Sequence, residues 1–244
     1  MKRFRLTTQA TGISLQDSQA NFSPIMIDFN QMNADWKYRG IGKNHDACKA
    51  IGLNKLKQNE SLTLLDATAG LARDAFIFAK LGASVTMLER HPSLALMIET
   101  ALEKLNDESL KQKLRFTFSD AILYLQSNDI SYDVIYLDPM FSDVDKRAKV
   151  KKDMQLLHGL IGENNDADAL LTLALAKAKK RVVVKRHKTS PFLDNQAPNH
   201  QIIGKSTRYD VYTPFNFCDV AKGQSLAPEK AQQSSLIQTK KNAL

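Results

Sequence analysis

The chain has 244 residues, 43% of them hydrophobic, which suffices for one sizeable α/β domain with appendages but hardly for two full domains. Its net charge of +8 favours a polyanionic partner such as nucleic acid. The sequence contains neither a membrane-spanning run nor the apolar core of a secretory signal, and its two cysteines show neither metal-type spacing nor a disulfide framework. We therefore expect a cytoplasmic protein that uses no metal.

The two ends of the chain are the least patterned parts. The first twenty residues are polar, and residues 24–29 have a short strand-like pattern before a glycine-containing loop and a short helix. We assign residues 1–60 to an N-terminal extension and residues 61–215 to the main domain. Residues 221–244 are rich in Gln, Ser and Lys, a composition typical of a flexible tail.

Short apolar strands alternate with helices through the main domain. This alternation predicts an α/β fold with a mostly parallel sheet that is covered on both faces. Ligands of such sheets bind at the carboxyl ends of the strands. In chain order we expect a strand over 62–66, a helix over 73–81, a strand over 84–89, a helix from Pro92, a strand over 114–118, a helix from about Ala121, a strand over 133–137, a helix over 166–180, a strand over 181–185 and a closing antiparallel pair within 200–213.

The first strand leads into a turn of small residues, DATAGLARDAF (66–76). The dinucleotide-binding pattern G-x-G-x-x-G is absent, since Gly70 is the only glycine of this turn, and a pyrophosphate site is disfavoured. Arg73 and Asp74 begin the following helix. They can hold an amino-acid zwitterion, with Arg73 facing its carboxylate and Asp74 its ammonium. The simpler interpretation is that Asp74 stabilises the helix N-terminus.

Acidic residues also end the second and third strands. Glu89 is followed by Arg90 and lies nineteen residues beyond Gly70, where an acid can accept the ribose hydroxyls of a nucleoside. The alternative for Glu89 is a surface salt bridge. The third strand ends in Ser119 and Asp120. The Asp120 carboxylate can accept a hydrogen bond from an adenine amino group or cap the next helix, and the sequence leaves both possibilities open.

The fourth strand ends in an acid, a proline and an aromatic residue, within YDVIYLDPMF (132–141). The lone pair of an exocyclic amine is delocalised into its ring, so methylation requires acceptors that grip the N–H groups. The Asp138 carboxylate and the Pro139 carbonyl suit this task, and Phe141 can stack on the base. Acids at consecutive strand ends together predict a site for an adenosyl cofactor.

These residues resemble a class I S-adenosylmethionine-dependent methyltransferase, because the D-P-M-F box is similar to the [D/N]-P-P-[Y/F] signature of enzymes that methylate amino nitrogens. With DATAGLARDAF, KRVVVKR and RYDVY, the box also resembles the bacterial ribosomal RNA small subunit methyltransferase J family. That family methylates N2 of a guanine in small-subunit ribosomal RNA. The resemblance covers roughly residues 25–213. Ala72 departs from a usual glycine, and Met140 replaces the second proline of the general box.

The resemblance implies a Rossmann-like fold with a mostly parallel seven-stranded sheet and an antiparallel C-terminal strand. It implies S-adenosylmethionine as cofactor, S-adenosylhomocysteine as product, and small-subunit (16S) ribosomal RNA or the 30S subunit as partner. By position, the catalytic residues are Asp138, Pro139 and Phe141. The cofactor residues are Arg73, Asp74, Glu89, Arg90, Ser119, Asp120 and Asp138.

Two basic segments, 145–153 and 179–188, flank the D-P-M-F box, and we expect them to contact RNA phosphates. The closest alternative function is an amino-methyltransferase of the same fold that acts on DNA or protein. A nicotinamide-dependent oxidoreductase and an RNA-binding module with a dead site are weaker alternatives. The cations assigned to phosphate contacts are Lys146, Arg147, Lys149, Lys151, Lys152, Lys185 and Arg186.

Overall fold

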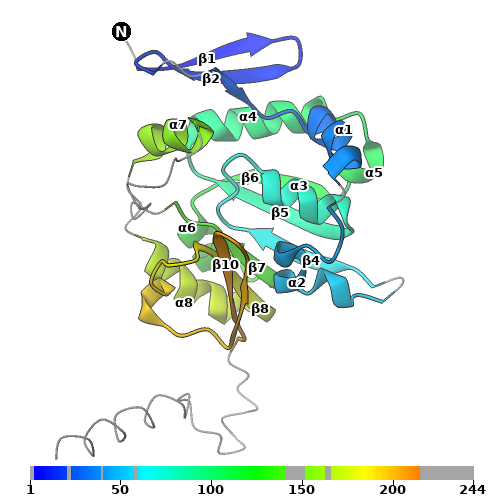
Figure 1. The fold of residues 1–244 in the computed structure, drawn as a ribbon, viewed down its shortest axis with the longest axis vertical. Coiled ribbons are helices and arrows are strands. Elements are labelled where there is room, and N and C mark those ends of the chain that lie inside the picture. The colour runs from blue at the N-terminus through cyan, green and yellow to red at the C-terminus, as the bar shows by residue number, and fades with distance from the viewer. Residues whose placement is uncertain are drawn as a thin grey trace, which may run out of the picture. The chain divides into compact units, whose positions relative to one another are not determined.

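A seven-stranded β-sheet forms the centre of the fold (Figure 1). Its strands are β4 (Leu62–Asp66), β5 (Ala83–Glu89), β6 (Leu114–Phe118), β7 (Tyr132–Leu137), β8 (Ala178–His187), β9 (His200–Ile203) and β10 (Thr207–Tyr212). The strand order is β6-β5-β4-β7-β8-β10-β9; β4 to β8 run parallel, and β10 is antiparallel to both of its neighbours. The predicted mostly parallel sheet is confirmed. The structure is a computed structural model that describes residues 3–20, 23–39, 41–57, 60–140, 152–162 and 166–214.

The central strands are apolar on both sides because both faces of the sheet are covered. Successive side chains of a strand point to opposite faces. Leu64 of β4 and Tyr136 of β7 accordingly belong to one hydrophobic cluster, whereas Leu65 and Ile135 belong to the other. All four are fully buried. This explains why the strands have near-continuous hydrophobic runs in place of an alternating pattern.

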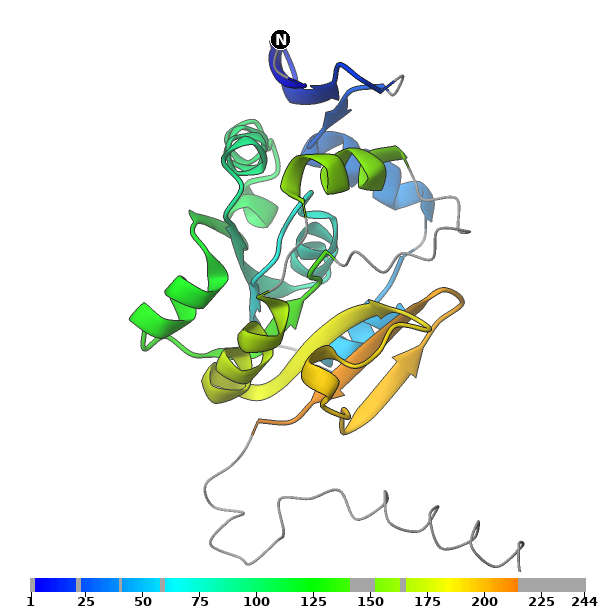
Figure 2. The ribbon, with the colours of Figure 1, turned by 90° about the vertical axis from the view of Figure 1, so that its left-hand side faces the viewer.

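Helices cover both faces of the sheet (Figure 2). Residues of α2, α3, α4, α5 and α7 contribute to the cluster that contains Leu64, and those of α6 and α8 to the cluster that contains Leu65. None of the helices in the described residues is long and apolar enough to cross a membrane. The helices are α1 (Phe29–Arg39), α2 (Asp46–Ile51), α3 (Arg73–Lys80), α4 (Pro92–Glu103), α5 (Glu108–Lys111), α6 (Ala121–Ser127), α7 (Lys152–Ile161) and α8 (Ala167–Lys177).

The N-terminal part forms a small antiparallel sheet of β1 (Phe4–Gln9), β2 (Gly12–Asp17) and β3 (Ile25–Met26). The strand pattern expected over 24–29 therefore yields only a two-residue strand, and α1 begins at Phe29. Leu15 and Phe29 join the same hydrophobic cluster as β4. Residues Met1–Pro214 accordingly form one compact unit.

The predicted antiparallel pair at the end of the main domain is confirmed as β9 and β10. Arg208 and Asp210 lie two residues apart on β10, so they share one face of the strand. Arg208 Nε and Nη2 donate to the two Asp210 carboxylate oxygens at 2.8 and 2.9 Å, and Gln201 Nε2 donates to the same carboxylate at 2.7 Å. Both charged residues are buried, and this network fixes β10 against β9.

Candidate active site

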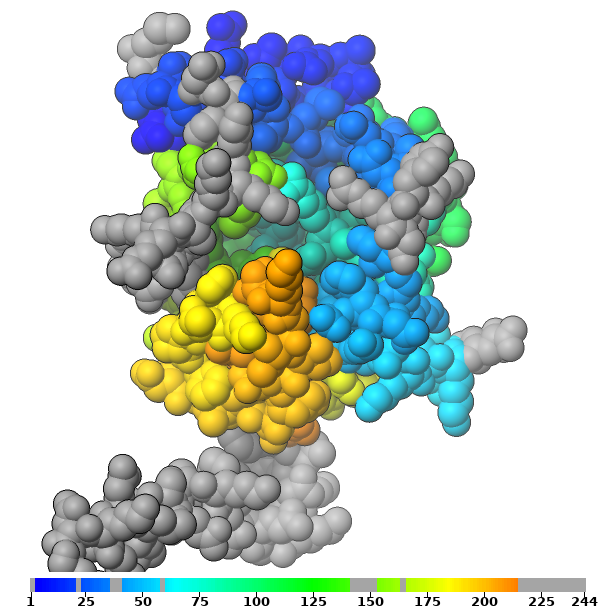
Figure 3. All heavy atoms as spheres, viewed as in Figure 1, coloured from blue at the N-terminus to red at the C-terminus, as the bar shows by residue number. Residues whose placement is uncertain are grey.

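A cavity of about 650 Å³ opens at the carboxyl ends of the parallel strands. It lies beside β4, which β5 and β7 flank on opposite sides, so it occupies the point where the strand order reverses. Figure 3 shows this face of the molecule, hollowed between the orange β10 segment and the light green α7. Phe141 lies outside the described residues. The other predicted site residues all line the cavity: Arg73, Asp74, Glu89, Arg90, Ser119, Asp120, Asp138 and Pro139.

The turn after β4 contains two residues in the left-handed region, Gly70 with φ 55° and Ala72 with φ 54°. Apart from the two neighbouring residues, the heavy atom nearest to an added Cβ at Gly70 would be the Thr68 carbonyl oxygen, at 3.9 Å. The backbone angle, and not lack of space, therefore favours glycine at this position. Ala72, which stands in place of a usual glycine, adopts a similar angle and is fully buried.

Glu89 shapes this turn from the end of β5. Its Oε2 accepts the Gly70 N–H at 2.9 Å, and its Oε1 accepts the His91 N–H at 2.7 Å. The residue is 8% exposed and lines the cavity, so the alternative of a surface salt bridge is wrong. Binding of ribose hydroxyls by its remaining lone pairs stays a prediction.

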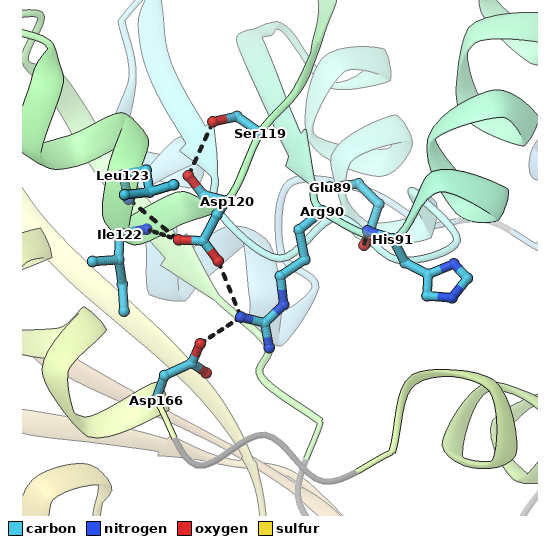
Figure 4. Close-up of polar contacts among 8 residues, drawn as sticks. All are labelled: Glu89, Arg90, His91, Ser119, Asp120, Ile122, Leu123 and Asp166. Atoms are coloured by element: carbon cyan, nitrogen blue, oxygen red, sulfur yellow. Dashed lines mark hydrogen bonds and ion pairs between the residues drawn. The ribbon is translucent and has the colours of Figure 1, made fainter.

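Asp120 caps α6 and also forms an ion pair (Figure 4). Its Oδ1 accepts the backbone N–H groups of Ile122 and Leu123 at 2.9 and 3.2 Å, which confirms the capping role. Its Oδ2 lies 3.0 Å from Arg90 Nη1. Partial burial opposes ionisation of Asp120, but the hydrogen bonds from Arg90 and from α6 outweigh it and lower the pKa of this carboxyl.

Arg90 connects this part of the cavity to the start of α8. Its Nη1 also pairs with Asp166, the residue that precedes α8 (Figure 4). Ser119 Oγ donates to the backbone carbonyl of Asp120 at 3.0 Å. The three predicted cofactor residues at this end of the cavity therefore lie in one contiguous hydrogen-bonded group.

A second charged cluster lies at the ends of β7 and β8. Lys185 Nζ lies 2.7 Å from Asp74 Oδ2 and 2.8 Å from Asp138 Oδ2. The Tyr136 hydroxyl donates to Asp74 Oδ2 at 2.6 Å. The backbone N–H of Asp138 donates to Thr68 Oγ1 at 2.7 Å, which ties the end of β7 to the turn after β4.

The carboxyl groups of this second cluster differ in their proton affinity. Burial would raise the pKa of Asp74, but Lys185 and the Tyr136 hydroxyl outweigh burial and lower it. At Asp138, burial together with the Asp74 carboxylate prevails over Lys185 and raises the pKa. Burial and the Asp74 carboxylate also raise the pKa of Asp66, well above its ordinary value.

Three residues that line the cavity were not predicted from the sequence to do so: Asp66, Asp166 and Lys185. Asp66 ends a buried strand, the same signal that identified Glu89 and Asp138. Asp166 and Lys185 carried no such signal, because their places depend on where α8 begins and on which strands are neighbours.

Two phosphate contacts predicted from the sequence are wrong. Lys185 is engaged by two carboxylates inside the cavity. Arg186 is only 6% exposed, and its Nη2 donates to the Pro191 carbonyl at 2.7 Å. The other predicted phosphate ligands are not described by the structure: Lys146, Arg147, Lys149 and Lys151 lie in undescribed stretches, and so does the side chain of Lys152.

Arg73 has an additional partner that the sequence did not indicate. Its Nη1 lies 2.6 Å from Asp153 Oδ2 of α7, so this helix is tied to the start of α3 beside the cavity. Whether Arg73 also holds a ligand carboxylate stays a prediction. Among the residues that the structure describes, no group of three or more His, Cys, Asp or Glu side chains is arranged to hold a metal ion.

The charges of the cavity favour a cationic ligand over a diphosphate. Asp74 and Asp138 oppose the single ammonium of Lys185, which leaves one negative charge in excess. The acids Glu89 and Asp120 line the opposite end together with Arg90, and the lining as a whole has six acidic side chains against four basic ones, so acids remain in excess. Such a site attracts a cation and repels a pyrophosphate.

Comparisons with known proteins identify the family. Residues 1–214 match the family model described as "Putative SAM-dependent methyltransferase". Ribosomal RNA small subunit methyltransferase J of Cellvibrio japonicus is 40% identical, covering 86% of this chain and 83% of the relative, and that of Psychromonas ingrahamii is 46% identical, covering 77% and 75%. The crystal structure of a SAM-dependent methyltransferase from Neisseria gonorrhoeae superposes with a TM-score of 0.67 at 32% identity, covering 91% of this chain and 86% of that one. The chain belongs to the ribosomal RNA small subunit methyltransferase J family of SAM-dependent methyltransferases.

Proposed function

We propose that the protein transfers a methyl group from S-adenosylmethionine to the N2 amino group of a guanosine in small-subunit (16S) ribosomal RNA. The relatives in its family carry the matching name. The observation that carries the proposal is the position of Asp138 and Pro139, which line the same cavity as Glu89 and Asp120. An amine held at the first pair would face a cofactor held at the second.

The cavity fits S-adenosylmethionine in size and in charge. Its volume of about 650 Å³ is within the range of small-molecule sites, roughly 300–1,000 Å³. The bound cofactor supplies an electrophilic methyl group on a sulfonium, and its net positive charge complements the acidic cavity. Glu89 would accept the ribose hydroxyls, and Asp120 the adenine amino group. Asp74 and Arg73 would face the ammonium and carboxylate of the methionine part.

Asp138 and Pro139 would orient the guanine amine. The Asp138 carboxylate and the Pro139 carbonyl accept its N–H groups, so that the nitrogen lone pair turns out of the ring plane toward the methyl group. Alignment of this kind is credited with roughly 7–11 kcal/mol in intramolecular reactions. Asp138 would take the proton that the amine releases after it is methylated, which does not require a strong base. Stacking of the base on Phe141 remains a prediction.

The RNA substrate would be bound through phosphates and through the extruded base. Extrusion of a stacked guanine costs a few kcal/mol, and contacts to phosphates offset it. Lys146, Arg147, Lys149 and Lys151 remain the predicted phosphate ligands. An enzyme that methylates ribosomal RNA is expected to act in the cytoplasm, on free RNA or on the 30S subunit.

The proposal is tested with unmethylated 30S subunits, purified DNA and bulk protein as acceptors of labelled methyl groups, followed by mass mapping of the modified nucleotide. We expect N2-methylguanosine at one position of the 16S RNA. Label found only in DNA or protein would support the alternative of another amino-methyltransferase and overturn the assignment.

The mechanism is tested with Asp138→Ala. This variant should lose methyl transfer while calorimetry still detects S-adenosylhomocysteine binding, because the cofactor contacts of Glu89 and Asp120 persist. Asp129→Ala is the matched control, since Asp129 is a fully exposed acid in the loop before β7. Near-normal turnover of Asp138→Ala would remove Asp138 from the mechanism.

A further inference from the structure

Lys185 is placed beside Asp138 by the pairing of two neighbouring parallel strands. Leu137 of β7 is in register with Val184 of β8, so the next residue of each strand, Asp138 and Lys185, emerges at the same edge of the sheet. The ammonium then lies 2.8 Å from Asp138 Oδ2. The contact thus follows from the sheet and not from a chance meeting of two flexible side chains.

The same ammonium reaches Asp74, on a different element. Lys185 Nζ lies 2.7 Å from Asp74 Oδ2, at the start of α3. Asp74 is a predicted cofactor residue and Asp138 a predicted catalytic one. The Lys185 side chain therefore contacts both a predicted cofactor residue and a predicted catalytic residue. It is 27% exposed, so it lies largely out of bulk water.

The Lys185 ammonium helps to keep both neighbouring carboxylates ionised. Two carboxylates in a partly buried site repel each other, and without a cation one of them tends to take up a proton. The Lys185 ammonium opposes the rise in the pKa of Asp138 and lowers the pKa of Asp74. Other titratable groups that act on this cluster come from several elements: Asp66 of β4, Tyr136 of β7, Tyr209 of β10 and His45, which precedes α2.

We infer that Lys185 is a positioning residue for methyl transfer, which holds the Asp138 carboxylate in place for the amine and ties it to Asp74 on the cofactor side. This inference rests on the proposed function. Lys185 acts through Asp138 and has no contact with the reacting atoms in this scheme. A protonated Asp138 would lose an acceptor oxygen, so removal of Lys185 should impair the reaction most at low pH.

The decisive experiment compares Lys185→Met with the wild type in the pH dependence of kcat/KM for RNA at saturating S-adenosylmethionine. Loss of the ammonium raises the pKa of Asp138, so the acidic limb of the pH profile should move up by roughly 1–3 pH units, the range for loss of a neighbouring opposite charge. Lys185→Arg should restore the wild-type limb in large part. Lys180→Met is the matched control, because Lys180 lies on the same strand but pairs with Asp133 away from the cavity.

A second measurement does not require the substrate. Carbon-13 NMR of protein labelled at the aspartate carboxyl carbons reports the titration of Asp138, identified by the resonance that Asp138→Asn removes. We expect this titration to move to higher pH in Lys185→Met and in Lys185→Gln, and to stay unchanged in Lys180→Met. Circular dichroism establishes whether each variant is folded. If Lys185→Met is not folded, Lys185→Gln and Lys185→Arg show whether the ammonium controls the Asp138 titration.

An unchanged Asp138 titration in the folded Lys185 variants would overturn the inference, and so would an activity loss that is equal at all pH values and is not rescued by Lys185→Arg. Failure of the wild type to methylate ribosomal RNA would instead refute the proposed function. In that case the NMR titration still shows whether Lys185 controls Asp138.

Discussion

Replacement of Asp120 by alanine and by asparagine separates its two roles. In the structure, Oδ1 caps α6 and Oδ2 pairs with Arg90. Asparagine is as good an N-cap as aspartate, whereas alanine cannot cap. Asp120→Asn therefore removes the charge and keeps the cap, and Asp120→Ala removes both.

The expected loss of stability follows from these contacts. Loss of an N-cap costs about 1 kcal/mol, within a range of roughly 0.5–2 kcal/mol. The ion pair adds less than about 1 kcal/mol, because the side chains of Asp120 and Arg90 are 25% and 38% exposed. In a chain of this size, Asp120→Ala should lower the unfolding midpoint by about 2–8 °C, and Asp120→Asn by clearly less.

Cofactor affinity should respond differently from stability. If the Asp120 carboxylate accepts the adenine amino group, loss of this charged hydrogen bond costs roughly 1.5–3 kcal/mol, or about 10- to 100-fold in the Kd of S-adenosylhomocysteine. Both variants should show this weakening. In Asp120→Asn the amide oxygen is occupied by the α6 backbone, so the side chain presents an NH₂ group to the ligand.

Thermal unfolding and isothermal titration calorimetry together test the two roles. Asp107→Ala is the matched control, because Asp107 caps α5 with a 3.0 Å bond from the Leu110 N–H and does not line the cavity. It should lose stability without losing affinity. A wild-type Kd in both Asp120 variants would refute the adenine contact, and an equal midpoint in both would refute the capping argument.

Three further predictions concern the strands and turns around the cavity. Gly70→Ala should destabilise the protein by about 1 kcal/mol in urea unfolding through its φ of 55°, and an unchanged midpoint would contradict this. Asp210→Ala should cost about 3–5 kcal/mol because it leaves Arg208 buried without its bidentate partner; a loss below 1 kcal/mol in the same assay would argue against a structural role. The raised pKa of Asp138 should place the acidic limb of wild-type kcat/KM above the ordinary aspartate value of about 3.9, since protonation removes an acceptor oxygen, and a limb at or below that value would exclude Asp138 as the titrating group.

The central sheet was predictable from the sequence because its strands are apolar on both faces. The strand expected over 62–66 has those bounds in the structure, and the strand expected over 133–137 begins one residue earlier. The N-terminal hairpin was not predicted. In β1, only Phe4 and Leu6 are partly buried, so the strand lacks the apolar run that marked the others.

Helix α7 was missed although its period is present in the sequence. Met154, Leu157, His158 and Ile161 follow the i, i+3, i+4, i+7 spacing of one helical face, and all four line the cavity. The basic residues just before them drew the interpretation toward an RNA-contacting segment. The cavity therefore has a largely apolar wall formed by α7, which could not be predicted from the residues at strand ends alone.

The acidic residues that line the cavity at strand ends could be predicted from the sequence, but their ion-pair partners could not. Each acid follows its own strand along the chain, which is local information. The pairs Arg73–Asp153, Arg90–Asp166 and Lys185–Asp74 join elements that are distant in sequence. They depend on strand order and on the placement of α7 and α8, which the order of elements along the chain does not specify.

The strand order also explains why the residues proposed for the cofactor and those proposed for the amine line one cavity. The strands β5 and β6 extend the sheet to one side of β4 and carry Glu89 and Asp120 at their ends, whereas β7 and β8 extend it to the other side and bring Asp138 and Lys185. Because these strands are parallel, all four side chains emerge at the same edge. Asp74, at the start of the helix after β4, and Asp138 both pair with the Lys185 ammonium, so the protonation of one carboxylate depends on the charge of the other.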